Sequence, residues 1–114
     1  SGALTGVEDL SALVGYQPGA VVSRTIVKRP TGTVTAFAFD AGEGLSEHTA
    51  AFDALVIGVD GSATVTIAGT DQLVAGGQAL LLPAGKPHSI RTTSRFKMLL
   101  VMIRAPANGG TAEP

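Results

Sequence analysis

The string from Gly77 to His88 constrains the fold of this 114-residue chain more than any other stretch. Its apolar run Ala79–Leu82 predicts a strand that is buried on both faces. Pro83 ends that strand, because proline removes a backbone donor from the ladder. Gly85 then predicts a tight turn, which delivers His88 to the start of the next strand. The string therefore predicts a histidine that is held rigidly at the end of a sheet.

The rest of the chain predicts an all-β domain of two packed antiparallel sheets. β-branched and apolar stretches of strand length alternate with turn residues, and charged residues make up only 15% of the chain. We expect strands over 21–28, 33–39, 46–50, 54–59, 63–68, 72–75, 79–82, 89–93 and 96–103. The residue pair 60–61, Asp-Gly, is typical of a β-hairpin turn between two of them. We expect the nearly apolar segment 96–103 to be covered by the other sheet and partly by a second subunit.

The two ends of the chain differ from this pattern. Thr5 and Glu8 form a capping-box pattern, which predicts a short α-helix over 5–14 that covers an end of the sheet. We therefore divide the chain into an N-terminal helix and lead-in (1–20), a β-barrel (21–104) and a flexible tail (105–114).

The bulk composition excludes several classes of function. The net charge of −1 is too small to attract nucleic acid or an anionic membrane. No segment has the apolar length of a membrane span, and no signal peptide is visible, so we expect a cytoplasmic protein. The chain has no Cys, which excludes disulfides and thiol chemistry. The clustered cations Arg91, Arg95 and Lys97 are expected to form a solvated face.

The Gly77–His88 string resembles the second motif of the cupin superfamily, Gly-x5-Pro-x-Gly-x2-His-x3-Asn, with Thr92 in place of the final Asn. The stretch from Gly42 to Gly61 resembles the first motif, Gly-x5-His-x-His-x3,4-Glu-x6-Gly, and His48 occupies its first histidine position. The chain is thus similar to small single-domain bacterial cupins. The resemblance implies a double-stranded β-helix, also called a jelly-roll barrel, and a homodimer.

In metal-binding cupins, two His and a Glu of the first motif and the His of the second motif hold one divalent ion. Only His48 and His88 are retained here, because Ala50 and Ala54 replace the other two ligands. The resemblance therefore implies either a two-histidine site for Zn, Ni, Fe, Mn or Cu, or no metal at all. By strand parity Asp53 faces away from His48, whereas Glu43 lies in a loop from which it could reach the site.

Three functions remain open for a site at the barrel mouth. His48 and His88 could hold a metal that acts on a small molecule. The protein could instead be a metal-free module that binds a small molecule, or a metal-free isomerase or cyclase in which the two histidines act as acid and base. Phe52 and Met98 are the candidate substrate-binding residues, whereas Phe37 and Phe39 are expected to lie in the core.

Overall fold

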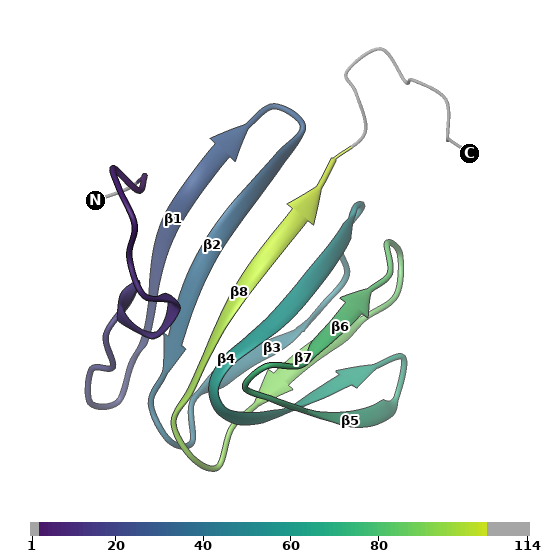
Figure 1. The fold of residues 1–114 in the computed structure, drawn as a ribbon. Coiled ribbons are helices and arrows are strands. Elements are labelled where there is room, and N and C mark those ends of the chain that lie inside the picture. The colour runs from purple at the N-terminus through teal and green to yellow at the C-terminus, as the bar shows by residue number, and fades with distance from the viewer. Residues whose placement is uncertain (1–2, 105–114) are drawn as a thin grey trace.

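The computed structural model describes residues 3–104, which form a strongly curled, nearly all-β fold (Figure 1). All strand pairs are antiparallel. The strands are β1 (Val21–Arg29), β2 (Gly32–Phe39), β3 (Gly44–His48), β4 (Asp53–Ile67), β5 (Thr70–Ala75), β6 (Ala79–Leu82), β7 (His88–Arg91) and β8 (Phe96–Ile103). The predicted all-β jelly-roll class is confirmed.

The long strand β4 connects the two halves of the sheet, and this corrects the sequence-based expectation of a hairpin. Residues 53–61 pair with β6 and β8, whereas residues 62–67 pair with β5 and β7. Gly61, with φ +71°, lies at the bend between the two parts. A Cβ atom there would lie 2.0 Å from the Arg95 carbonyl oxygen of β8's lead-in. The Asp60-Gly61 pair therefore bends one strand sharply instead of reversing the chain, because β5 and β7 take the pairing positions beyond it.

The apolar core lies between the two halves of the sheet. Phe39, Phe96 and Val65 are completely buried there, and the ring centroids of the two phenylalanines lie 5.8 Å apart. The strand β8 lies between β2 and β4, so its backbone is paired on both sides. The apolar segment 96–103 therefore has no unpaired backbone edge. By contrast, the expectation that β6 is buried on both faces is wrong, since Leu81 is 49% exposed.

The N-terminal segment crosses the outer face of the sheet beside β1 (Figure 1). The predicted α-helix over 5–14 is wrong, because only a 3-10 turn forms, η1 (Leu10–Ala12). Instead of closing a capping box, Glu8 pairs with Arg24 at 3.2 Å. Leu13 and Val14 are buried against β1 and β2. A helix this short has little intrinsic stability, so contacts with the sheet decide the conformation.

Arg91 and Arg95 are solvent-exposed, as predicted, with side chains 63% and 52% exposed, and each of the three cations also has a local partner. Arg91 pairs with Asp71, whereas Arg95 pairs with Asp40. Lys97 lies over the ring of Tyr16. The predicted tail over 105–114 lies outside the described residues. None of the helical segments in residues 3–104 has the length and apolar character that a membrane crossing requires.

Candidate functional site

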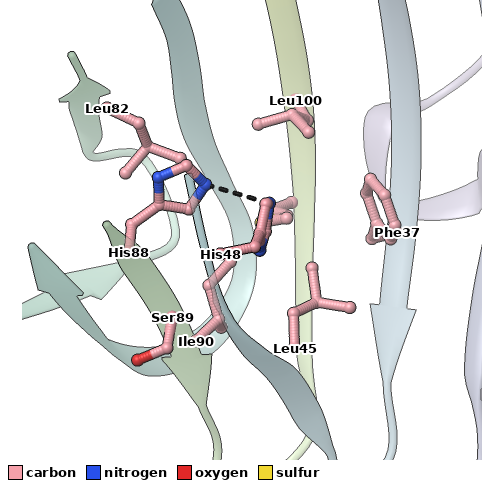
Figure 2. Close-up of a pocket in the computed structure, with 9 residues that line it drawn as sticks. Phe37, Leu45, His48, Leu82, His88, Ser89, Ile90 and Leu100 are labelled. Carbon is pink, nitrogen blue, oxygen red and sulfur yellow. Dashed lines mark hydrogen bonds between the residues drawn. The ribbon is translucent and has the colours of Figure 1, made fainter. Parts of the chain in front are cut away.

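The structure brings His48 and His88 together, although 40 positions separate them in the chain. Their Nε2 atoms lie 3.1 Å apart, and the two rings meet edge to face with centroids 4.4 Å apart. His48 is the last residue of β3 and His88 the first of β7, and the two strands pair at this point. Figure 2 shows the contact as a dashed line at the edge of a cavity.

An irregularity in β3 turns His48 toward the cavity. Leu45 pairs with Ile90 and His48 with His88, so β3 advances three residues while β7 advances two. In a regular strand Leu45 and His48 would face opposite sides. The β-bulge at Ser46 and Glu47 reverses that parity, so both side chains line the cavity.

A stiff loop holds His88. Gly85 has φ +80°, as the predicted turn requires, and the Lys86 backbone N–H donates to the Pro83 carbonyl at 3.3 Å. Two further bonds tie this loop to the segment between the histidines: the Gly85 N–H donates to the Ala50 carbonyl, and the Ala84 N–H donates to the Asp53 carboxylate, each at 2.8 Å. The Asp53 carboxylate thus supports the loop.

Both imidazoles use Nδ1 for a backbone contact. Nδ1 of His48 lies 3.0 Å from the Ser46 carbonyl oxygen, and Nδ1 of His88 lies 3.3 Å from the Lys86 carbonyl oxygen. A carbonyl oxygen only accepts, so each Nδ1 carries the hydrogen. In the neutral rings both Nε2 atoms are then unprotonated. Two lone pairs face each other over 3.1 Å, an arrangement that a cation, a proton or a hydroxyl donor at these nitrogens would stabilise.

Burial opposes the proton as the shared species. His88 is only 6% exposed. Burial lowers the pKa of His88 below its ordinary value, the contact with the Lys86 carbonyl partly opposes this, and the charge of His48 lowers the pKa further. The His88 ring therefore favours the neutral, ligand-competent form at neutral pH.

The cavity beside the histidines has a volume of about 290 Å³ and a mostly apolar lining. Figure 2 shows His88 and Leu82 on one side and Phe37 across from them. The lining residues are Phe37, Leu45, His48, Leu82, His88, Ser89, Ile90, Met98 and Leu100. Met98 lines the cavity, and its role in substrate binding stays a prediction. Phe52 is not among these residues and lies in the bend before β4, so the structure gives no support to a role for it in substrate binding.

The sequence interpretation missed most of this lining. Phe37 was expected in the core, and Leu45, Leu82, Ile90 and Leu100 were not singled out. The alternation of side chains along a strand could have identified three of these residues, Phe37, Leu100 and Ile90. Phe37 shares a parity with the core residue Phe39, Leu100 with Met98, and Ile90 with His88. Leu45 could not be found this way because the bulge breaks the parity.

The donor set fits a metal only in part. Two imidazole nitrogens that bind one ion at ordinary bond lengths of about 2.0–2.2 Å lie about 2.9–3.4 Å apart, and the observed separation is 3.1 Å. The carbonyl contacts at Nδ1 are the type of outer contact that orients metal-binding histidines. Within residues 3–104, however, no group of three or more His, Cys, Asp or Glu side chains is close enough to hold a metal. Glu43, the carboxylate considered as a third ligand, therefore does not complete the set.

The fold and the two-histidine mouth define a small cupin-type barrel, and comparison with solved structures agrees. A conserved protein of unknown function from Streptococcus pyogenes, SPY1581, superposes with a TM-score of 0.86 and 35% identity, covering 91% of each chain. A cupin superfamily protein from Desulfitobacterium hafniense, DSY2733, has a TM-score of 0.84 and 26% identity over 89% of this chain and 93% of its own.

A third structure is a Cupin 2 conserved barrel domain protein from Leptotrichia buccalis. It is 37% identical with a TM-score of 0.80, over 82% of this chain but 46% of its own. No family model matches the chain, and neither does any curated protein. The chain belongs to the cupin superfamily.

Proposed function

We propose that this cupin-domain protein binds one divalent transition-metal ion through Nε2 of His48 and Nε2 of His88, and holds a small molecule in the adjoining cavity. The observation that carries the proposal is the convergence of two unprotonated Nε2 atoms at 3.1 Å, each fixed by an Nδ1 contact to a carbonyl. A bound ion would supply Lewis-acid polarisation of a ligand oxygen. The chain's own residues would position this ion and orient the small molecule.

The apolar lining would also exclude water from the cavity. Leu82, Ile90 and Met98 are buried, and they line the same cavity as the histidine pair. In such surroundings electrostatic interactions are stronger than in water. With only two protein ligands, the remaining coordination positions of an ion are left to water or to the small molecule.

Metal content and zinc titration test the metal part of the proposal. Untagged protein, purified without chelator, is expected to carry up to one metal per chain, and metal-free protein is expected to bind one Zn²⁺. His48→Ala and His88→Ala should each abolish that binding, whereas Ser89→Ala should retain it. Normal zinc uptake by both histidine variants would overturn the assignment.

A metal-free binding module is the second candidate, and the incomplete ligand set favours it. Ala50 and Ala54 occupy the positions where metal-binding cupins carry a histidine and a glutamate, so no carboxylate supports the two imidazoles. In that case a small molecule alone, without zinc, should raise the melting temperature. A metal-free isomerase or cyclase would use the same pair as acid and base, with activity that survives chelation.

We also propose that two copies associate through the outer face of the sheet. Leu81 and Val101 both pair with Leu55 across neighbouring strands, so the three side chains share one face. Leu81 and Ile103 are 49% and 60% exposed on it. Covering such a face would remove apolar area from water. Sedimentation analysis should show a dimer that Leu81→Lys weakens; a wild-type monomer at micromolar concentration would refute this.

A further inference from the structure

We infer that the cavity selects a small uncharged molecule with one weakly acidic hydroxyl group, a phenol or an enol, on an otherwise apolar body. The inference rests on the proposed role of the histidine pair in holding a small molecule, and it does not require the metal. It names the chemical class of ligand that this mouth and this lining accept together.

The head group follows from the hydrogen-bonding state of the two rings. Because both Nδ1 atoms donate to carbonyl oxygens, the mouth presents two acceptors and no ring N–H. An ether or a ketone offers only acceptors, so both Nε2 atoms and the ligand oxygen would stay without a hydrogen bond. A hydroxyl group supplies the missing donor to one Nε2 atom. A weakly acidic hydroxyl makes the stronger bond, and its oxygen is also a good ligand if an ion is present.

The body of the ligand follows from the lining. Phe37, Leu45 and Leu100 lie around the part of the cavity away from His88 (Figure 2). Met98 and Ile90 also line the cavity, and both are buried. Apart from the two histidines, Ser89 supplies the one polar side chain of the lining. Figure 2 shows its hydroxyl group directed away from the imidazole pair. A ligand body in this space therefore gains apolar contacts and finds few hydrogen-bond partners.

The lining also disfavours anions. None of the residues that line the cavity is an arginine or a lysine. A phosphate or a carboxylate would lose its hydration without a paired cation, which is strongly unfavourable. A polyhydroxylated molecule would leave most of its hydroxyl groups unpaired for the same reason. The site should therefore reject phosphorylated sugars and aromatic acids of the same size.

The volume limits the ligand to about one substituted ring. An apolar cavity of about 150 Å³ admits benzene, and the volume here is about 290 Å³. A ring with a short alkyl substituent fits this space. The para-substituted phenol 4-ethylphenol is a suitable probe, because 4-ethylanisole has nearly the same shape without the hydroxyl donor and 4-ethylbenzoate replaces the hydroxyl by an anion.

The test is an NMR titration of metal-free, untagged protein with these three probes. We expect 4-ethylphenol to shift signals of the cavity residues and to bind about tenfold or more tightly than 4-ethylanisole, the difference that one hydrogen bond makes. 4-Ethylbenzoate should bind more weakly than the phenol. Equal binding of phenol and ether, tighter binding of the benzoate, or no binding of the phenol would each overturn the inference.

Two ring-preserving variants assign the preference to the histidines. His48→Phe and His88→Phe keep a ring in place and remove one acceptor each, so the preference for phenol over ether should shrink in both. His48 is exposed, so its variant should fold even if that of the buried His88 does not. If the double variant His48→Phe/His88→Phe folds and still prefers the phenol over the ether as strongly as the wild type does, the inference is contradicted.

A parallel zinc titration separates this inference from the metal proposal. Selective phenol binding by a protein that takes up no zinc would support the ligand class and overturn the metal. Zinc uptake without phenol binding would support the metal site and overturn the ligand class.

Discussion

Nε2 of His48 and Nε2 of His88 lie 3.1 Å apart, and each ring is held from its other nitrogen by a carbonyl two residues earlier in the chain. The bulge in β3 and the stiff loop before β7 produce this arrangement. Both nitrogens are consequently aimed by backbone geometry, which holds a site more rigidly than flexible side chains do.

The two histidines should differ in their effect on stability. His48→Ala changes an exposed side chain and should alter the free energy of unfolding by less than about 0.5 kcal/mol. His88→Ala empties a buried position and should cost about 1–3 kcal/mol. Urea denaturation of both variants measures the difference. Equal costs for the two would mean that the burial of His88 has been misjudged.

The bend in β4 should depend on the absence of a side chain at Gly61. Gly61→Ala combines a positive φ with a Cβ atom 2.0 Å from the Arg95 carbonyl oxygen, so we expect a loss of about 3 kcal/mol or more. Gly69 also has a positive φ, +84°, but an added Cβ there meets nothing within 4 Å. Gly69→Ala, the matched control, should cost only about 1–2 kcal/mol. A similar loss in both variants, measured by urea denaturation, would show that φ alone matters.

The single tyrosine offers a direct spectroscopic reading of the N-terminal segment. The ring of Tyr16 lies beneath Arg95 and Lys97, and its hydroxyl donates to Asp60 at 2.6 Å. Burial, followed by the bond to Asp60, raises the pKa of Tyr16 above its ordinary value of 10.0. The folded protein thus holds this proton more tightly than the unfolded chain does. Its contribution to stability is present below pH 10 and is lost as the pH rises further.

Absorbance at 295 nm during an alkaline titration follows this one group. Ionisation should be delayed beyond pH 10 and should coincide with unfolding, and Asp60→Asn should bring it to lower pH. Ionisation near pH 10 with the fold intact would contradict the account.

Asp40 should make stability fall in acid. The Gly19 N–H donates to its carboxylate at 2.7 Å, and Arg95 pairs with it at 3.0 Å. The bond from Gly19 first, and that from Arg95 second, lower the pKa of Asp40 below its ordinary value of 3.8. Because the folded-state pKa is lower than the ordinary one, the ionised carboxylate stabilises the protein at pH values above the ordinary pKa. This stabilisation is lost as the pH falls through the folded-state pKa. Asp40→Asn should therefore be less stable than the wild type at pH 7.

The same comparison at low pH supplies the control. The difference in melting temperature between Asp40→Asn and the wild type should shrink from pH 7 to pH 3. A difference that stays constant over this range would show that the charge of Asp40 plays no part.

Local patterns predicted most of the strands but not the places where the chain departs from regular geometry. The Gly77–His88 string predicted a turn, a strand and a delivered histidine, because proline and glycine act locally. The pair Asp60-Gly61 carries a hairpin signal of equal strength, yet the chain bends there without reversing. Whether such a pair turns or bends depends on which strands stand beyond it, and that is a tertiary property.

The cavity was harder to predict than the histidine pair. The two motifs indicated His48 and His88, but no residue type announces the bulge at Ser46 and Glu47, which brings Leu45 to the same cavity as His48. Phe52 was one of the two candidate substrate-binding residues. It lies in a bend, where strand alternation says nothing about which way a side chain points.

The measurement that tests the central claim most directly is a long-range ¹H–¹⁵N spectrum of the imidazole nitrogens in metal-free protein at neutral pH. The chain has two histidines, so the signals can be assigned with one variant. We predict that both rings carry the hydrogen on Nδ1, that both Nε2 atoms are unprotonated, and that one equivalent of Zn²⁺ shifts both Nε2 signals together. A ring that carries its hydrogen on Nε2, or a zinc response in only one ring, would contradict the account.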